Sequence, residues 1–231
     1  MIKNDKNIIH HLIKLGKKEH IEGFRNKGIV FMNSINFFKE MEEDEQRKDL
    51  HEGIERIEQV TWIKIEGKGK EIEFRKDTKE NILSSAQLRV ANPELEGNLY
   101  SMIAITTDLY AKTDKLDKRN MEFGDSFLVI FNPKEFLNRI DKAVKILELE
   151  YYWNLVSYYD EESHNGNLGI FNKSKKYEHQ NEFRIFVENN KKEELILNIG
   201  SIEDVSKIFD IDEFERLRFK IENGIINERS D

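Results

Sequence analysis

The stretch Tyr177-Glu-His-Gln-Asn-Glu-Phe-Arg-Ile-Phe-Val187 alternates polar and apolar residues, which is typical of a β-strand. The apolar members, which would point into a core, are Phe183, Ile185 and Val187. The polar members, which would share the other face at intervals of about 7 Å, are Gln180, Glu182 and Arg184. This pattern predicts a strand that borders a cleft, although an ordinary exposed strand face would look the same.

Strands and helices alternate irregularly around this stretch. The segments expected to form strands are 8–15, 29–32, 60–65, 71–74, 99–106, 126–131, 151–159, 182–188 and 195–199, and the last two are expected to pair. Helices are expected over 17–26 with Gly28 at the end, from Asn132-Pro133 onward, and over 212–223; Ser201 to Asp204 resembles a capping box. Without regular βαβ alternation, the pattern predicts one α+β domain over 1–231, with a mixed sheet core and peripheral helices.

The composition favours a globular protein of the cytoplasm. The net charge of −8 argues against a surface that attracts nucleic acid everywhere. The absence of cysteine excludes disulfides, thiol catalysis and thiolate metal sites. No apolar run approaches the roughly 20 residues of a membrane helix, and the start is too polar for a signal peptide, so we expect no membrane partner.

The pattern Phe171-x-Lys173-x3-Tyr177-x2-Gln180-x-Glu182-Phe183-Arg184 resembles the closing motif of a group of uncharacterised bacterial and phage proteins. The chain is similar to that group elsewhere too, in Lys14 to Ser34 with Phe38, in Arg47-x-Asp49-x2-Glu52-Gly53, in Phe123-Gly-Asp125, and in Leu197-x-Ile199-Gly200 followed by Asp204. The resemblance implies a setting of conflict between phage and bacterium but names no mechanism.

A second resemblance is to ADP-ribosyltransferases, which carry Gln-x-Glu or Glu-x-Glu on a late strand. It implies a fold of that kind and NAD as substrate, with a protein or nucleic acid as acceptor. Glu182 would be the catalytic carboxylate, because positive charge develops on the ribose as nicotinamide leaves, and Gln180 would orient the acceptor. Lys14 and Arg184 would contact the dinucleotide phosphates, and Asn33 or Ser34 would line the nicotinamide pocket. The chain departs from that family where its first strand offers His10, His11 or Lys14 for the usual Arg or His.

The competing hypothesis is a non-enzymatic protein that binds a phage or host protein through the charged loop at residues 40–56. Glu182→Gln would abolish activity in the enzyme and leave binding nearly unchanged. The enzyme hypothesis also requires Lys14 and Glu182 to lie on the same side of the core.

A hard-metal nuclease site would have to use Asp49 and Glu52 with Asp125 or Glu182. No two histidines have the His-x3-His spacing of a helical zinc site, and His10 and His11 would face opposite sides of a strand. We therefore predict no metal site.

Overall fold

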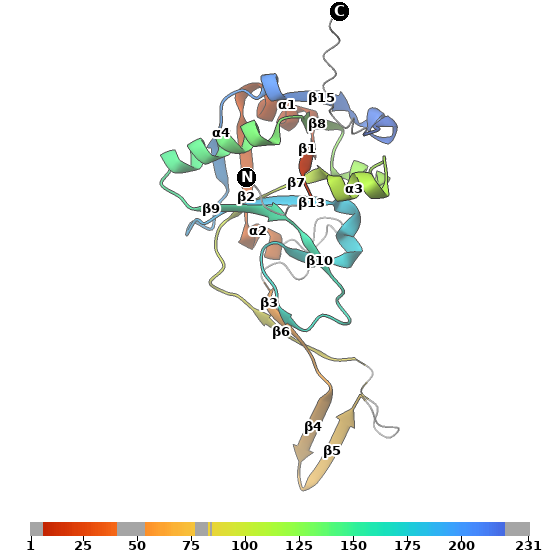
Figure 1. The fold of residues 1–231 in the computed structure, drawn as a ribbon. Coiled ribbons are helices and arrows are strands. Elements are labelled where there is room, and N and C mark those ends of the chain that lie inside the picture. Colours follow the sequence, from red (N-terminus) through yellow and green to blue (C-terminus); the bar gives the residue numbers. More distant parts are fainter. Residues whose placement is uncertain (1–6, 41–53, 77–82, 84, 220–231) are drawn as a thin grey trace, which may run out of the picture.

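The computed structural model describes residues 7–40, 54–76, 83 and 85–219, and its fold is α+β, with largely antiparallel sheets and few helices (Figure 1). The first strands are β1 (Ile9–Gly16), β2 (Ile29–Ser34), β3 (Ile54–Gln59), β4 (Trp62–Gly67), β5 (Lys70–Arg75), β6 (Gln87–Ala91), β7 (Asn98–Thr106) and β8 (Ser126–Ile130). The later ones are β9 (Tyr151–Leu155), β10 (Ser157–Tyr159), β11 (Gly166–Asn167), β12 (Asn172–Ser174), β13 (Glu182–Val187), β14 (Leu195–Asn198) and β15 (Ser206–Asp210). The helices are α1 (Lys18–Lys27), α2 (Ile35–Glu40), α3 (Thr107–Lys112) and α4 (Pro133–Ile146), with 3-10 turns η1 (Lys118–Phe123), η2 (Lys175–Gln180), η3 (Glu203–Val205) and η4 (Ile211–Arg216).

The main sheet has eight strands, in the order β14-β2-β7-β1-β8-β15, with β13 paired to β7 and β9 paired to β13. The nine-residue strand β7 is its centre, because it pairs with β1, β2 and β13. Directly paired residues of neighbouring strands point to the same face of a sheet. The register therefore decides which side chains meet on each face.

The first face of the sheet is covered by α1 and α4, which lie together in the upper half of Figure 1. Its core includes Leu12, Tyr100, Met102, Leu128, Phe183 and Ile185 from strands, and Phe24, Phe136, Ile140 and Val144 from the two helices. The rings of Phe24 and Phe136 lie 5.9 Å apart in an edge-to-face contact, so the two helices also pack on each other.

The second face carries two smaller clusters. One contains Ile13, Leu15, Ile103, Ile105, Phe127 and Phe214, and the other contains Ile35, Leu99 and Phe186, with Ile170 and Phe171 packed against it. Residues 156–181, which we call the covering segment, contain β10, β11, β12 and η2 and bring Ile170 and Phe171 onto this face.

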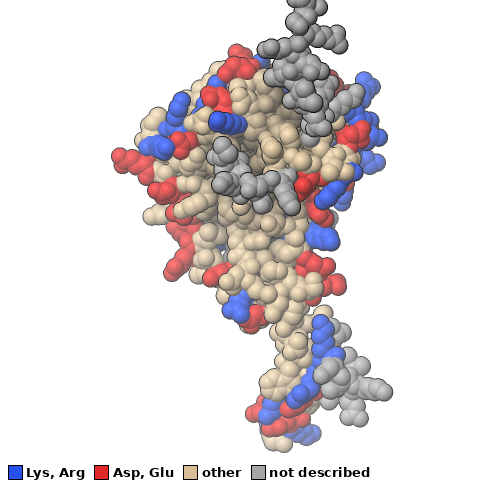
Figure 2. All heavy atoms as spheres, in the orientation of Figure 1, with Lys and Arg blue, Asp and Glu red and all other residues tan. Residues whose placement is uncertain are grey.

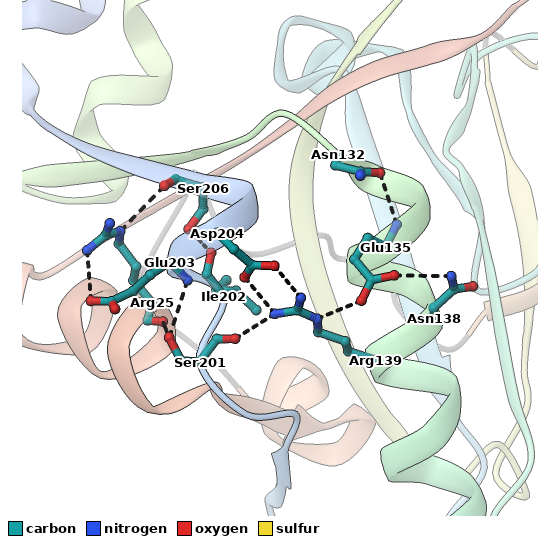
Figure 3. Close-up of polar contacts among 10 residues, drawn as sticks. All are labelled: Arg25, Asn132, Glu135, Asn138, Arg139, Ser201, Ile202, Glu203, Asp204 and Ser206. Atoms are coloured by element: carbon teal, nitrogen blue, oxygen red, sulfur yellow. Dashed lines mark hydrogen bonds and ion pairs between the residues drawn. The ribbon is translucent and has the colours of Figure 1, made fainter.

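A salt-bridge network fastens α4 to the turn before β15 (Figure 3). The Arg139 guanidinium donates from its two terminal nitrogens to the two carboxylate oxygens of Asp204, at 2.9 and 2.5 Å, and also to the Ser201 carbonyl and to Glu135. Arg25 donates to the Glu203 carboxylate at 3.2 Å, which ties α1 to the same turn. The turn therefore links both helices of the first layer.

The hairpin of β4 and β5, Trp62–Arg75, projects from the lower end of the molecule, and we call it the arm (Figure 1). In the described residues β4 and β5 pair only with each other. Lys68 and Gly69 both have positive φ, 45° and 73°, which is typical of a two-residue hairpin turn. The strands expected over 60–65 and 71–74 therefore form the two halves of one hairpin.

Four local predictions were wrong. Segments 182–188 and 195–199 do not pair with each other, because β13 pairs with β7 and β9 and β14 pairs with β2. The expected helix over 212–223 is the short turn η4, as far as the described residues extend, and Ser201 precedes only the three-residue η3, with its hydroxyl accepting from the Glu203 N–H. The expected strand over 151–159 is divided at Val156 into β9 and β10.

The prediction that His10 and His11 face opposite sides was also wrong. The register of β1 against β7 shifts between Ile9 and His11, as in a β-bulge. Consequently the His10 ring contacts Tyr110, the His11 ring contacts Phe219, and Tyr110 and Phe219 contact each other.

In the part of the chain that the structure describes, no helix is long and apolar enough to cross a membrane.

Candidate functional site: a buried cluster around Glu182

The Gln-x-Glu pattern lies where η2 leads into β13. The strand begins at Glu182, so Gln180 belongs to the last turn of η2 and not to the strand. Asn181 between them has a left-handed backbone with φ of 43°, a conformation that asparagine tolerates better than most residues. The predicted alternation along one strand face was therefore wrong for Gln180.

Gln180 and Glu182 are nevertheless brought together by Lys173 of β12. The Lys173 ammonium donates to Oε1 of Gln180 at 2.8 Å and to Oε2 of Glu182 at 3.0 Å. Its Nζ also lies 4.8 Å from the centre of the Tyr177 ring, which is a cation–π distance. One ammonium group thus joins β12, η2 and β13.

Arg184 completes the cluster from the next position on the same strand face. Its Nε donates to Oε1 of Glu182 at 2.8 Å, and its guanidinium also donates to the Ile170 carbonyl. The Ser101 hydroxyl, on the strand next to β13, donates to the Glu182 carboxylate as well. Both oxygens of Glu182 therefore accept charge-assisted hydrogen bonds.

Burial alone would raise the pKa of Glu182. The positive charges of Arg184 and Lys173, with the hydrogen bonds from Arg184 and Ser101, outweigh burial and hold the pKa of Glu182 well below its usual range. The carboxylate is therefore ionised throughout the physiological pH range. A catalytic acid with a raised pKa would need a different environment.

The cluster is closed to solvent. Lys173, Gln180, Glu182 and Arg184 are 5%, 6%, 6% and 1% exposed, and all six residues of β13 are buried. We expected the polar face of this strand to point away from the core, and that expectation was wrong because the covering segment lies over it. The segment is held by the Val156 N–H, which donates to the Glu182 carbonyl, and by the Tyr158 hydroxyl, which accepts from the Glu182 N–H at 2.8 Å.

Lys14 lies on the opposite face of the sheet from Glu182. On β1 it pairs with Leu128, a member of the core under α1 and α4, and its ammonium lies 4.2 Å from the Tyr100 ring centre in the same core. Glu182 pairs with Ile103, a member of the core on the other face. The convergence of Lys14 with Glu182 that the enzyme hypothesis requires is therefore absent, because their registers give the two side chains opposite directions.

Asn33 and Ser34 are consecutive residues of β2, so their side chains point to opposite faces of the sheet. Asn33 pairs with Leu99 and so shares the sheet face of Glu182, but Leu99 stands between its strand and β13. The Ser34 hydroxyl accepts from the Phe37 N–H at 3.2 Å and so holds the first turn of α2. Of the six predicted site residues, only Gln180, Glu182 and Arg184 meet.

Sequence reasoning assigned no role to Lys173, Ser101 or Tyr158, although Lys173 is part of the closing motif. The signal in the sequence was the lysine of the closing motif, nine residues before Glu182, within a polar segment that also contains glycine. Tyr158 belongs to the aromatic-rich residues 151–159, and aromatic side chains of this kind can stack on nucleic-acid bases. In the structure its hydroxyl accepts the hydrogen bond described above, and burial raises its pKa.

The metal-site alternative can be traced in part. Asp49 and Glu52 fall outside the described residues, while the Asp125 carboxylate accepts from the Lys18 N–H at the start of α1. Among the residues whose placement is described, no group of three or more His, Asp and Glu side chains is placed to hold a metal ion.

The cluster can fix the covering segment on the sheet. Its carboxylate already has two cationic partners, Lys173 and Arg184.

No protein-family model, curated protein or solved structure matches this chain.

Proposed function

We propose that this chain is a non-enzymatic protein-binding module and that the arm is its binding element. One observation carries the proposal: large apolar side chains are exposed along a projecting hairpin. Trp62, Ile65 and Ile72 are 48%, 55% and 47% exposed. Isolated two-stranded hairpins are marginal in water, so an exposed apolar hairpin of this kind is typical of an element that packs on another surface.

The charges of the arm favour a protein over nucleic acid as partner. Residues 62–75 carry four basic and three acidic side chains, a net charge of +1. Acidic and basic side chains stand side by side near its end (Figure 2). A nucleic-acid groove would instead need a run of positive charge without interspersed carboxylates.

The buried cluster supports the same proposal, because its carboxylate is closed to solvent and already bound by Lys173 and Arg184. Glu182 is buried and already accepts hydrogen bonds from Lys173, Arg184 and Ser101, so a ribose hydroxyl could reach it only after the covering segment moved. In this geometry the cluster acts as an internal fastening. The charged loop first considered as the binding element lies, over residues 41–53, outside the described residues.

The competing function is NAD-dependent ADP-ribosyl transfer. One observation favours it: Gln180 and Glu182 converge on a single ammonium group, as two residues of one catalytic pair would converge on a substrate. It would need the covering segment to open, and the dinucleotide phosphates would need a cation other than Lys14.

Two measurements on the full chain separate these functions. A photo-crosslinking amino acid at position 72, in the arm, should form protein adducts in lysate that Ile65→Lys removes and the α4 surface variant Ile146→Lys retains. Labelled NAD should remain intact with both wild type and Glu182→Gln. Label transfer or nicotinamide release that disappears in Glu182→Gln would overturn the proposal in favour of the enzyme.

A further inference from the structure

The arm continues a small sheet that is separate from the main one. In the described residues β3 pairs with β6 and β11, and none of these three strands pairs with a strand of the main sheet. Only Val60 and Thr61 lie between β3 and the arm. The Val60 N–H donates to the Ala86 carbonyl at 2.9 Å, and the Thr61 carbonyl accepts from the Lys76 N–H at 3.1 Å. The small sheet, which lies between the body and the arm in Figure 1, therefore sets the direction of the arm.

The root of the arm, which we define as Gln59 and Gln87, is fastened to the covering segment. The two residues are paired across β3 and β6, so their side chains lie on one face. The side-chain amide of Gln59 donates to the carbonyls of Glu161 and His164, at 3.1 and 2.9 Å. The side-chain amide of Gln87 donates to the same Glu161 carbonyl. Both root side chains thus converge on one turn of the covering segment.

The turn that accepts these hydrogen bonds is itself held in shape. The Asp160 carboxylate accepts from the N–H groups of Glu162 and Ser163, at 2.9 and 3.2 Å. The Lys176 ammonium, on η2, lies 3.2 Å from a carboxylate oxygen of Glu161. The turn therefore gives the root a shaped support that is linked to η2.

A second attachment of the small sheet runs through β11, which belongs to the covering segment. Gly166 of β11 pairs with Ile57 of β3, and the Ile57 side chain is fully buried. The Leu168 N–H, just beyond β11, donates to the Glu55 carbonyl at 2.7 Å. The covering segment therefore holds β3 along its length as well as at the root of the arm.

The covering segment is fastened in turn to the main sheet by the buried cluster. Lys173 and Gln180 belong to this segment, whereas Glu182 and Arg184 belong to β13. The ion pair of Lys173 with Glu182 and the hydrogen bond from Arg184 to the Ile170 carbonyl join the two. A continuous series of contacts thus leads from β13, through the covering segment, to the root of the arm.

We propose that Gln59 and Gln87 are positioning residues that fix the direction of the arm, and that the buried cluster supports them through the covering segment. A two-stranded hairpin has too little packing of its own to hold a direction, so its direction depends on its root. The inference rests on the proposed function in one respect. A binding element whose direction is fixed beforehand loses less freedom on association and so binds more tightly.

The direction of the arm can be measured in the purified full chain. Because the chain contains no cysteine, Lys70→Cys in the arm and Ile146→Cys on α4 place two spin labels at chosen exposed positions. Double electron–electron resonance then gives the distribution of distances between the labels. We expect a single narrow distribution from this doubly labelled chain.

The root is tested by Gln59→Glu combined with Gln87→Glu. This change keeps the size of both side chains, but an ionised carboxylate has no proton to donate to the carbonyls of the turn. The distance distribution should therefore become at least about twofold wider. Leu88→Gln, at an exposed position next to Gln87 on β6, is the control and should leave the width unchanged. A width that stays the same in the double variant would overturn the inference.

The far end of the series is tested by Lys173→Met, which does not touch the arm. It should also widen the distribution, whereas the exposed Lys175→Met should not. Lys176→Met, which removes the contact with Glu161 nearer the surface, should act in the same direction and serves if Lys173→Met fails to fold. A distribution that widens with the two glutamine changes but with neither Lys173→Met nor Lys176→Met would overturn the support by the buried cluster.

The yield of adducts in lysate connects the direction of the arm with binding. With the photo-crosslinking amino acid at position 72, Gln59→Glu with Gln87→Glu should lower the yield at least about threefold. An unchanged yield from a chain with a widened distribution would overturn the positioning role in binding. If the unaltered arm forms no adducts while the distributions change as expected, the proposed function fails and the fixing of the arm by its root stands.

Discussion

The ammonium nitrogen of Lys173 lies 3.0 Å from a carboxylate oxygen of Glu182, and both side chains are more than nine-tenths buried. The pair joins a strand of the covering segment to a central strand of the main sheet. Removing one member of a buried ion pair leaves its partner without part of its compensation and is strongly destabilising. The pair therefore serves to hold the covering segment in place.

We expect Lys173→Met to lower the free energy of unfolding by about 3 kcal/mol. The change removes the hydrogen bonds to Gln180 and Glu182 together. Urea denaturation followed by circular dichroism measures the effect. Lys175→Met, two residues away and exposed, is the matched control and should change stability by less than about 0.5 kcal/mol. Equal effects of the two variants would contradict a structural role for the pair.

Glu182→Gln should change how stability depends on pH. The folded-state pKa of Glu182 lies below its unfolded value of about 4.3, so its ion pairs stabilise the fold above that pH. This contribution is lost as the pH falls from about 4.3 towards the folded-state pKa. The difference in unfolding free energy between wild type and Glu182→Gln should therefore be largest at neutral pH and shrink between about pH 5 and pH 3. A difference that stays constant over this range would show that the carboxylate charge is not involved.

The ion pair between Arg139 and Asp204 should contribute modestly to the attachment of α4, because Asp204 is 59% exposed. We expect a double-mutant cycle of Arg139→Gln and Asp204→Asn to give a measurable coupling, since the contact is bidentate, and the coupling should fall with added salt. The exposed single contact of Lys145 with Asp141 on the same helix is the comparison and should couple more weakly. A coupling between Arg139 and Asp204 no larger than that between Lys145 and Asp141 would contradict a role of the contact drawn in Figure 3 in attaching α4.

Local signals predicted the ends of several elements correctly. Asn132 accepts a hydrogen bond from the Glu135 N–H at the start of α4, and Gly28 ends α1 with a left-handed backbone. Both features depend on residues only a few positions apart, which the sequence displays directly.

Strand partners and burial depend on contacts distant in the chain. Strand β13 pairs with β7, and in this register Arg184 lies opposite Ser101. The two residues are 83 positions apart, so no local sequence pattern specifies that they meet. Residues 160–176 are mostly polar, yet Lys173 among them is buried, because Glu182 and Gln180 accept hydrogen bonds from its ammonium group. For the same reason a strand with two buried faces looked like one with an exposed polar face.

The end of α1 offers a test in which two glycines of one helix should respond in opposite directions. Gly28 has φ of 67°, and a Cβ there would lie 1.9 Å from the Gly200 carbonyl oxygen. Gly28→Ala should therefore destabilise the chain by at least about 1 kcal/mol, since it combines an unfavourable backbone conformation with a clash against backbone. Gly23 lies inside α1, and a Cβ there would meet nothing within 4 Å, so Gly23→Ala should stabilise the chain by about 0.5–1 kcal/mol through helix propensity. Thermal and urea unfolding of both variants measure the difference. A neutral Gly28→Ala variant would contradict the close contact between the end of α1 and the turn at Gly200.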